Sequence, residues 1–236
     1  MVPKTIHLCW FSNDPFPVEI KVCINTWKRL LPDYKIRQWT YEDALAINNK
    51  FVNEALALKK WAFAADVIRF YALYKEGGVY MDSDIFLYKR FDDFIPDSSF
   101  ATFSECYNKK KGKIGLQAAF MIGEKGNTFC KDMLDYYHNI HFRKENGTID
   151  IEVSPLKMAD IAERYGYINK DIEQHLDGIT IYPTRFLSPL KKFNHSPERI
   201  GVHRVYGSWR KRKFGRNVEI KVKHYYHIVK YTFTGK

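Results

Sequence analysis

The chain has 236 residues, of which 45% are hydrophobic and 16% aromatic, and it carries a formal net charge of +11. This length and apolar content exclude an intrinsically disordered chain and predict one α/β domain with an added elaboration. No stretch approaches the ~18 uninterrupted apolar residues of a membrane-spanning helix, and no basic segment with a long apolar run opens the chain, so neither a membrane span nor a signal peptide is expected.

The first elements alternate between strand and helix. Residues 5–11 are predicted to form a short buried strand, and the segment 12–19, with two prolines, a loop. Apolar residues recur at helical spacing over 19–31, and a strand over 34–40 and a helix over 41–47 follow. This order is typical of βαβ units and predicts a parallel sheet.

The next helix and strand contain three acids in an otherwise apolar stretch. Apolar residues at three- and four-residue steps predict a helix over 60–75, which Gly77 and the glycine after it would end. Residues 79–89 are predicted to form one strand that contains Asp82 and Asp84. Residues two apart in an extended chain point to the same side, so these two carboxylates are expected side by side beyond a strand end.

Beyond residue 105 the pattern predicts fewer elements. In chain order they are a basic loop over 105–115, a strand over 116–124, helices over 127–141 and 154–166, and a short strand over 179–183. Ser154 is expected to cap the second of these helices, with Pro155 at its first position. The segment 217–231 fits a strand and a helix equally well.

The acids favour metal and sugar chemistry. Two carboxylates held together, such as Asp82 and Asp84, repel unless a cation or proton lies between them, and oxygen ligands suit Mg²⁺ or Mn²⁺. A solvated strand end is the structural alternative. Asp66 and Arg69 are neighbours on one helix face, either as a structural ion pair or as an acceptor for a sugar hydroxyl beside a fixed cation.

Four segments together resemble glycosyltransferase family 32, the DXD sugar-binding transferases of surface polysaccharide synthesis. They are PKTIHLCW at 3–10, ADVIRFYALYKEGGVYMDSD at 65–84, YPTRFLSP at 182–189 and HRVYGSW at 203–209. The second segment is highly specific. The resemblance implies a GT-A-like α/β fold, in which a Rossmann-like, mostly parallel sheet carries appended acceptor-side helices. It also implies a retaining, Mn²⁺- or Mg²⁺-dependent hexosyltransferase acting in bacterial capsule or other surface polysaccharide synthesis.

The same resemblance implies a donor-binding site. Trp10 would stack on the nucleobase, or else be a core aromatic. Asp66 and Arg69 would hold the donor sugar and phosphate, and Ser208 and Trp209 would close over the diphosphate as a lid, with a packed loop as the alternative. The full donor-binding set is Trp10, Asp66, Arg69, Tyr80, Asp82, Ser208 and Trp209.

The implied metal ligands are Asp82, Asp84 and His203. Asp84 would be the main ligand, whereas a plain surface histidine is the alternative for His203. The implied catalytic residues are Asp66, Arg69, Asp82 and Asp84.

The chain departs from the family at two places. Ala65 stands where the family often has serine, so one donor contact would be absent or replaced. Ser154-Pro155 stands where Gly-Pro is usual, so the resemblance does not define the acceptor side.

The expected domain is residues 1–209, divided into a nucleotide-sugar-binding half, about 1–105, and an acceptor-side half with the lid, 106–209. Residues 210–236 form a basic aromatic tail. Such a tail can attach to an anionic membrane surface. The expected location is therefore cytoplasmic, with peripheral attachment to the cytoplasmic face of the membrane, or the tail is simply a solvated charge run.

The expected partners are a nucleotide-sugar donor and a saccharide or lipid-linked acceptor. UDP-hexoses and UDP-N-acetylhexosamines are the favoured donors and GDP-mannose is the outlier. Two rival functions are a metal-dependent phosphohydrolase that uses the Asp-x-Asp motif and a basic nucleic-acid-binding protein. Nucleic acid is not expected as a partner, because no docking motif accompanies the charge.

The four cysteines, Cys9, Cys23, Cys106 and Cys130, match no metal-binding spacing. A chain of this size folds without covalent links between its segments, so reduced thiols of a cytosolic protein are expected. Disulfides are the alternative.

Overall fold

The computed structural model describes most of the chain. The described residues are 1–108, 112–143, 149, 153–187, 197–204, 222, 225, 226 and 229. The lid residues Ser208 and Trp209 and almost all of the tail 210–236 lie outside them.

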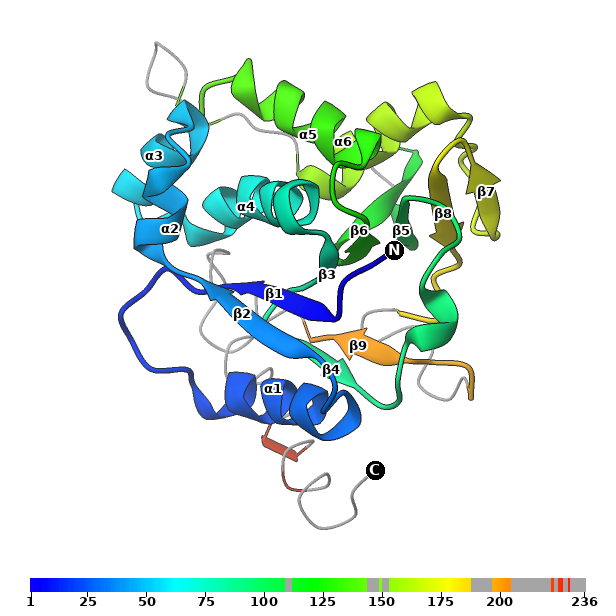
Figure 1. Ribbon diagram of the computed structural model, residues 1–236, viewed down its shortest axis with the longest axis horizontal. Helices are drawn as coiled ribbons and strands as arrows, with labels where there is room; N and C mark the ends of the chain where they lie inside the picture. The colour runs from blue at the N-terminus through cyan, green and yellow to red at the C-terminus, as the bar shows by residue number, and fades with distance from the viewer. Residues whose placement is uncertain are drawn as a thin grey trace.

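A seven-stranded sheet forms the centre of the molecule, with the strand order β2-β1-β3-β6-β5-β8-β7 (Figure 1). Its strands are β1 (Thr5–Cys9), β2 (Lys35–Trp39), β3 (Gly78–Met81), β5 (Phe100–Asn108), β6 (Lys113–Gly123), β7 (Gln174–Leu176) and β8 (Ile179–Tyr182). The pairings make β2, β1, β3, β5 and β8 run in one direction and β6 and β7 in the other. The predicted α/β class with a mostly parallel sheet is therefore confirmed.

Helices cover both faces of this sheet. The α-helices are α1 (Val18–Leu30), α2 (Tyr41–Ala46), α3 (Lys50–Ala57), α4 (Trp61–Glu76), α5 (Thr128–His138) and α6 (Ser154–Ala162), and the 3-10 helices are η1 (Asp92–Phe94) and η2 (Glu163–Tyr165). Helices α4, α5 and α6 lie on one face and α1 on the other (Figure 1). Each face has its own apolar core, built around residues such as Phe70 on the first face and Trp27 on the second.

A small second sheet lies on the α1 side and pairs β4 (Ile85–Leu87) antiparallel with β9 (Gly201–His203). Helix α1 holds β4 through two hydrogen bonds. Trp27 Nε1 donates to the Ile85 carbonyl oxygen at 2.7 Å, and the Leu87 N–H donates to Thr26 Oγ1 at 3.1 Å. These bonds hold the chain after Asp84 against α1.

The predicted end of the long helix is confirmed at Gly77. Its N–H donates to the Leu73 carbonyl oxygen at 2.9 Å, and its φ of 68° lies in the region that favours glycine. The next glycine must also be small, because a Cβ on Gly78 would lie 2.5 Å from the Thr5 carbonyl oxygen. Strand β3 can therefore pair closely with β1.

The predicted single strand over 79–89 is wrong, because the chain turns at residues 82–84. The Ile85 N–H donates to the Asp82 carbonyl oxygen at 2.9 Å, and the two halves become β3 and β4 in different sheets. The two carboxylates are brought together by this turn and not by the alternation of an extended strand.

Several other elements also differ from the prediction. The predicted loop over 105–115 is wrong, since β5 continues to Asn108 and β6 begins at Lys113. Helix α3 and strand β9 were not expected. Ser154 is the first residue of α6 and not its cap, which is Val153.

The described cysteine side chains, Cys9, Cys23 and Cys130, are free thiols, as expected. Cys106 has its side chain outside the described part. Among the helices that the structure describes, none combines the length and the apolar character needed to cross a membrane.

Candidate functional site

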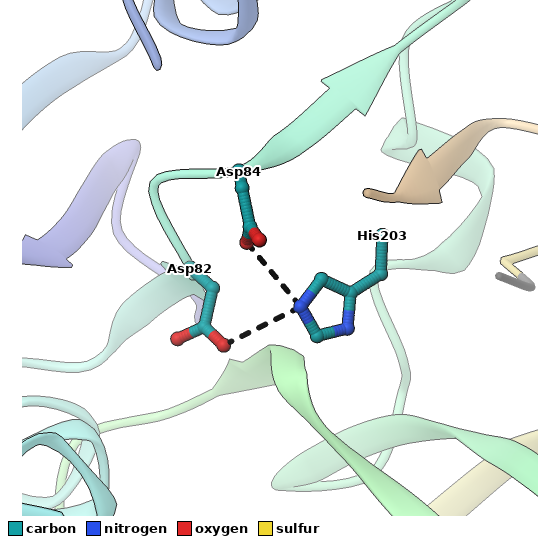
Figure 2. Close-up of side chains that lie close together, drawn as sticks. All are labelled: Asp82, Asp84 and His203. Carbon is teal, nitrogen blue, oxygen red and sulfur yellow. Dashed lines mark ion pairs between the residues drawn. The ribbon is translucent and has the colours of Figure 1, made fainter. Parts of the chain in front are cut away.

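The turn between β3 and β4 and the end of β9 bring three predicted metal ligands together (Figure 2). His203 is the last residue of β9 and pairs with Ile85, directly after the turn. Its Nε2 lies 3.3 Å from Asp84 Oδ1 and 3.8 Å from Asp82 Oδ2. One ligand atom from each of the three residues lies within 4.8 Å of the other two.

This cluster fits a divalent cation by its donor chemistry. Asp84 is buried, and Asp82 and His203 are partly buried. Two carboxylates and an imidazole are ligands for first-row divalent metals. The negative charge of the two carboxylates needs compensation when these groups are removed from water. The arrangement can therefore bind a metal ion. His203 is not a plain surface histidine.

The protonation of His203 compensates part of that charge in the metal-free protein. Burial by itself would lower the pKa of His203, but the charge and hydrogen bond of Asp84, with the charges of Asp82 and Glu105, raise it to about 9. His203 is therefore an imidazolium at neutral pH. A metal ion that binds its Nε2 must displace this proton.

Mn²⁺ affinity is expected to increase with pH. Below the His203 pKa of about 9, the fraction of neutral imidazole falls about tenfold for each unit by which the pH is lowered. The Mn²⁺ affinity should therefore rise about 100-fold from pH 6 to pH 8. Calorimetric titration of the nucleotide-free protein measures this slope. In His203→Gln the slope should disappear, and a wild-type affinity that is constant over this range would show that His203 is not a ligand.

Arg69 connects the metal cluster to helix α4. Its side chain is 6% exposed, and its Nη2 lies 3.2 Å from Asp66 Oδ1 and 3.4 Å from Asp82 Oδ1. Its Nε donates to the Ala65 carbonyl oxygen at 3.1 Å, and its guanidinium lies over the Tyr80 ring at 5.0 Å. These contacts hold a permanent positive charge between two of the predicted catalytic carboxylates.

Asp66 retains some access to solvent, with a side chain 17% exposed. Burial raises the pKa of Asp66 to about 6, the charge of Asp82 adds to this effect, and Arg69 opposes it. The carboxylate is therefore ionised at neutral pH but close to its titration range. A carboxylate in this state accepts hydrogen bonds readily.

Tyr80 lies in strand β3, two residues before Asp82. It is almost completely buried, and its hydroxyl donates to Asp82 Oδ1 at 2.8 Å. Burial raises the pKa of Tyr80 well above 10, so this hydroxyl keeps its proton. The contact orients Asp82, a role that the sequence did not indicate.

Trp10 directly follows β1, at the edge of the sheet where β3 also ends. Its Nε1 donates to the Asp14 carbonyl oxygen at 2.9 Å, and its ring packs edge-on against Phe16 at 4.8 Å between centroids. Trp10 is partly buried and packs against the apolar core on the α1 face. The other aromatic of the predicted donor site, Trp209, lies outside the described residues.

Two residues near the cluster were missed from the sequence. Glu105, in β5, contributes to the raised pKa of His203. Gln117, in β6, accepts a hydrogen bond from the Ala119 N–H at 3.2 Å, and the Ala119 carbonyl oxygen in turn accepts the Asp82 N–H at 2.8 Å. Gln117 stands alone among apolar residues from Ile114 to Gly123, and this was the available signal for it, whereas Glu105 lies in a mixed stretch that gave none.

The chain is similar to several solved glycosyltransferases. A glycosyltransferase involved in the glycosylation of the major capsid of PBCV-1 has 13% identity and a TM-score of 0.46, over 92% of this chain and 98% of that one. The galactosyltransferase LgtC, in complex with donor and acceptor sugar analogues, has 12% identity and a TM-score of 0.40, over 92% and 94%. The PaToxG glycosyltransferase has 19% identity and a TM-score of 0.45; the match covers 57% of this chain and 59% of that one.

No curated protein is significantly similar to the chain in sequence. The family described as capsular polysaccharide synthesis protein matches residues 1–175. That match covers most of the central sheet, the turn with Asp82 and Asp84, and helix α4. The chain therefore belongs to the family of capsular polysaccharide synthesis proteins, in agreement with the polysaccharide-synthesis transferase that its motifs predicted.

Proposed function

We propose that the chain is a metal-dependent, retaining glycosyltransferase. It moves a hexose or N-acetylhexosamine from a UDP-sugar to a saccharide or lipid-linked saccharide acceptor during capsule synthesis. The observation that supports this proposal most directly is the convergence of Asp82, Asp84 and His203 beside the Asp66–Arg69 pair. Family membership supports the polysaccharide pathway.

Asp82, Asp84 and His203 are the residues that would hold the cation. Carboxylates suit both Mg²⁺ and Mn²⁺, but an imidazole ligand favours the transition metal, so we propose Mn²⁺. When bound, such an ion neutralises the negative charge of a departing nucleoside diphosphate. Tyr80 keeps Asp82 in position through its hydroxyl.

Arg69 and Asp66 act on the reacting centre in this proposal. The Arg69 guanidinium is fixed by Asp66 and Asp82 and so needs no reorganisation to stabilise charge that develops on the leaving phosphate. The Asp66 carboxylate would accept a sugar hydroxyl and favour positive charge on the sugar ring. Retention would arise from attack on the same face as the leaving phosphate; a trapped glycosyl-aspartate would contradict this.

The donor nucleotide would lie along the edge where β1 and β3 end. The partly buried Trp10 ring would stack there on a nucleobase. We assign the donor-binding half to residues 1–105 and the acceptor side with the lid, including Ser208 and Trp209, to 106–209.

Calorimetric titration with UDP and GDP tests the proposal. With Mn²⁺ present, UDP is expected to bind in the micromolar range, and GDP at least about tenfold more weakly. Without a divalent metal, binding should be lost. Failure of both nucleotides to bind with any metal, or turnover of simple phosphate esters, would contradict the proposal, the latter in favour of a phosphohydrolase.

We also propose that the protein is cytoplasmic and associates with the inner face of the membrane through its tail, residues 210–236. Support comes from composition, because basic residues near an anionic surface contribute about 1 kcal/mol each. Sedimentation with phosphatidylglycerol vesicles should remove the full chain from solution but not a chain truncated after Trp209.

A further inference from the structure

Strand β6 bulges beside the turn that carries the proposed metal ligands. Thr102 of β5 lies opposite Met121 of β6. Two positions further along β5, Ser104 lies opposite Leu116, which is five positions back along β6. The extra length forms the β6 bulge, residues 117–120. Bulges are common next to active sites, where they redirect side chains or end the pairing of strands.

Two side chains hold the β6 bulge in place of regular backbone pairing. Gln117 Oε1 accepts the Ala119 N–H at 3.2 Å. The Thr102 hydroxyl donates to the Gln117 carbonyl oxygen at 2.7 Å and to the Phe120 carbonyl oxygen at 3.2 Å. Gln117 is 1% exposed and Thr102 is fully buried, so both side chains act on the backbone and not on a ligand.

The β6 bulge provides the backbone anchor of Asp82. The pairing of β3 with β6 ends at Met81 and Phe120. One step beyond this pair, the Ala119 carbonyl oxygen accepts the Asp82 N–H at 2.8 Å. Ala119 is therefore bonded to the Gln117 side chain through its N–H and to Asp82 through its carbonyl oxygen. A shift of Ala119 would displace the start of the turn, and the Asp82 carboxylate with it.

Only one half of the Gln117 amide is used. In the part of the chain that the structure describes, its Nε2 is buried and has no hydrogen-bond partner. An unpaired buried donor costs stability, and an apolar side chain of similar length would avoid this cost. The presence of an amide at this position is therefore better explained by what its Oε1 holds in place than by stability alone.

We infer that Gln117 is a positioning residue for Asp82, because its Oε1 holds Ala119 where that residue's carbonyl oxygen binds the Asp82 N–H. The inference rests on the proposed function, in which Asp82 is a ligand of Mn²⁺. Groups that orient metal ligands typically contribute about 10- to 100-fold in metal affinity. The side-chain contacts of Asp82 with Tyr80 and Arg69 would remain without Gln117, so we expect the lower end of this range.

Gln117→Met in the full chain tests the inference through two measurements. Calorimetric titration with Mn²⁺ at pH 8, without nucleotide, is expected to give an affinity about tenfold below that of wild type. In the metal-free protein, hydrogen exchange measured by NMR should become faster at the Asp82 amide and stay unchanged at the amides of β1. A general loss of stability would instead speed exchange at all of these amides together.

Gln174→Met is the matched control. Gln174 is 6% exposed in the edge strand β7, and its side chain bonds to the backbone of Ile168 and Lys170. Loss of these bonds should lower the thermal midpoint but leave the Mn²⁺ affinity at its wild-type value. Gln117→Glu is the conservative variant. It keeps an acceptor oxygen at the end of a side chain of the same length and should restore most of the Mn²⁺ affinity.

Thr102→Val provides a second route if Gln117→Met does not fold. It removes the other side-chain bonds of the β6 bulge with little change in size, so it should also lower the Mn²⁺ affinity and speed exchange at the Asp82 amide. Wild-type Mn²⁺ affinity in the folded variants of both residues, or an equal loss in Gln174→Met, would overturn the inference and leave the proposed function intact. If wild type itself binds no Mn²⁺, the proposed function fails, and the inference fails with it.

Discussion

Replacing Asp84 by asparagine is expected to lower glycosyl transfer at least about 1,000-fold and to abolish Mn²⁺-dependent binding of UDP. Asp84 is the most buried of the three proposed ligands, and its Oδ1 lies 3.3 Å from His203 Nε2. The substitution removes one of two negative charges without changing the size of the side chain. The remaining carboxylate and imidazole would bind the cation too weakly to hold a diphosphate against it.

The measurements are the rate of UDP release from the UDP-sugar and calorimetric titration of UDP with Mn²⁺. Asp93→Asn is the control, because it removes one charge from an exposed position in η1. It should retain wild-type values in both assays. Metal-dependent UDP binding that survives in Asp84→Asn would remove Asp84 from the metal site.

Replacing Arg69 by methionine is expected to lower the free energy of unfolding by about 3–5 kcal/mol. The guanidinium is nearly completely buried and compensates Asp66 and Asp82, so its loss leaves two partly buried carboxylates close together. Methionine preserves much of the apolar volume, so the effect reports mainly on charge. Urea unfolding at neutral pH measures it.

A double variant separates charge compensation from packing. In a chain that already carries Asp66→Asn, Arg69→Met should lower the free energy of unfolding by less than it does alone, because only Asp82 then remains uncompensated. If the losses in the free energy of unfolding of the two single variants simply add in the double variant, Arg69 stabilises the fold through packing. A loss below about 1 kcal/mol in the single variant would show that solvent already screens the cluster.

Much of the candidate site could be predicted from the sequence because its parts are local. Asp66 and Arg69 lie three residues apart on one helix, and helical geometry alone makes them neighbours. The end of α4 at Gly77 also follows from a local property, because glycine readily adopts the positive φ found there. The Asp-x-Asp spacing identified two of the three proposed metal ligands for the same reason.

The sequence by itself determined the α/β class, the helix with Asp66 and Arg69, and the acids that follow it, because short-range periodicity and glycine positions specify these features. Only the tertiary structure decided that the strand breaks at Asp82, and only there does His203, which the family resemblance but no local pattern indicated, lie beside Asp84. The physical reason is that hydrogen bonds from α1 and the pairing of β4 with β9 join segments that lie far apart in the chain. Such pairings leave no periodic signal near either partner.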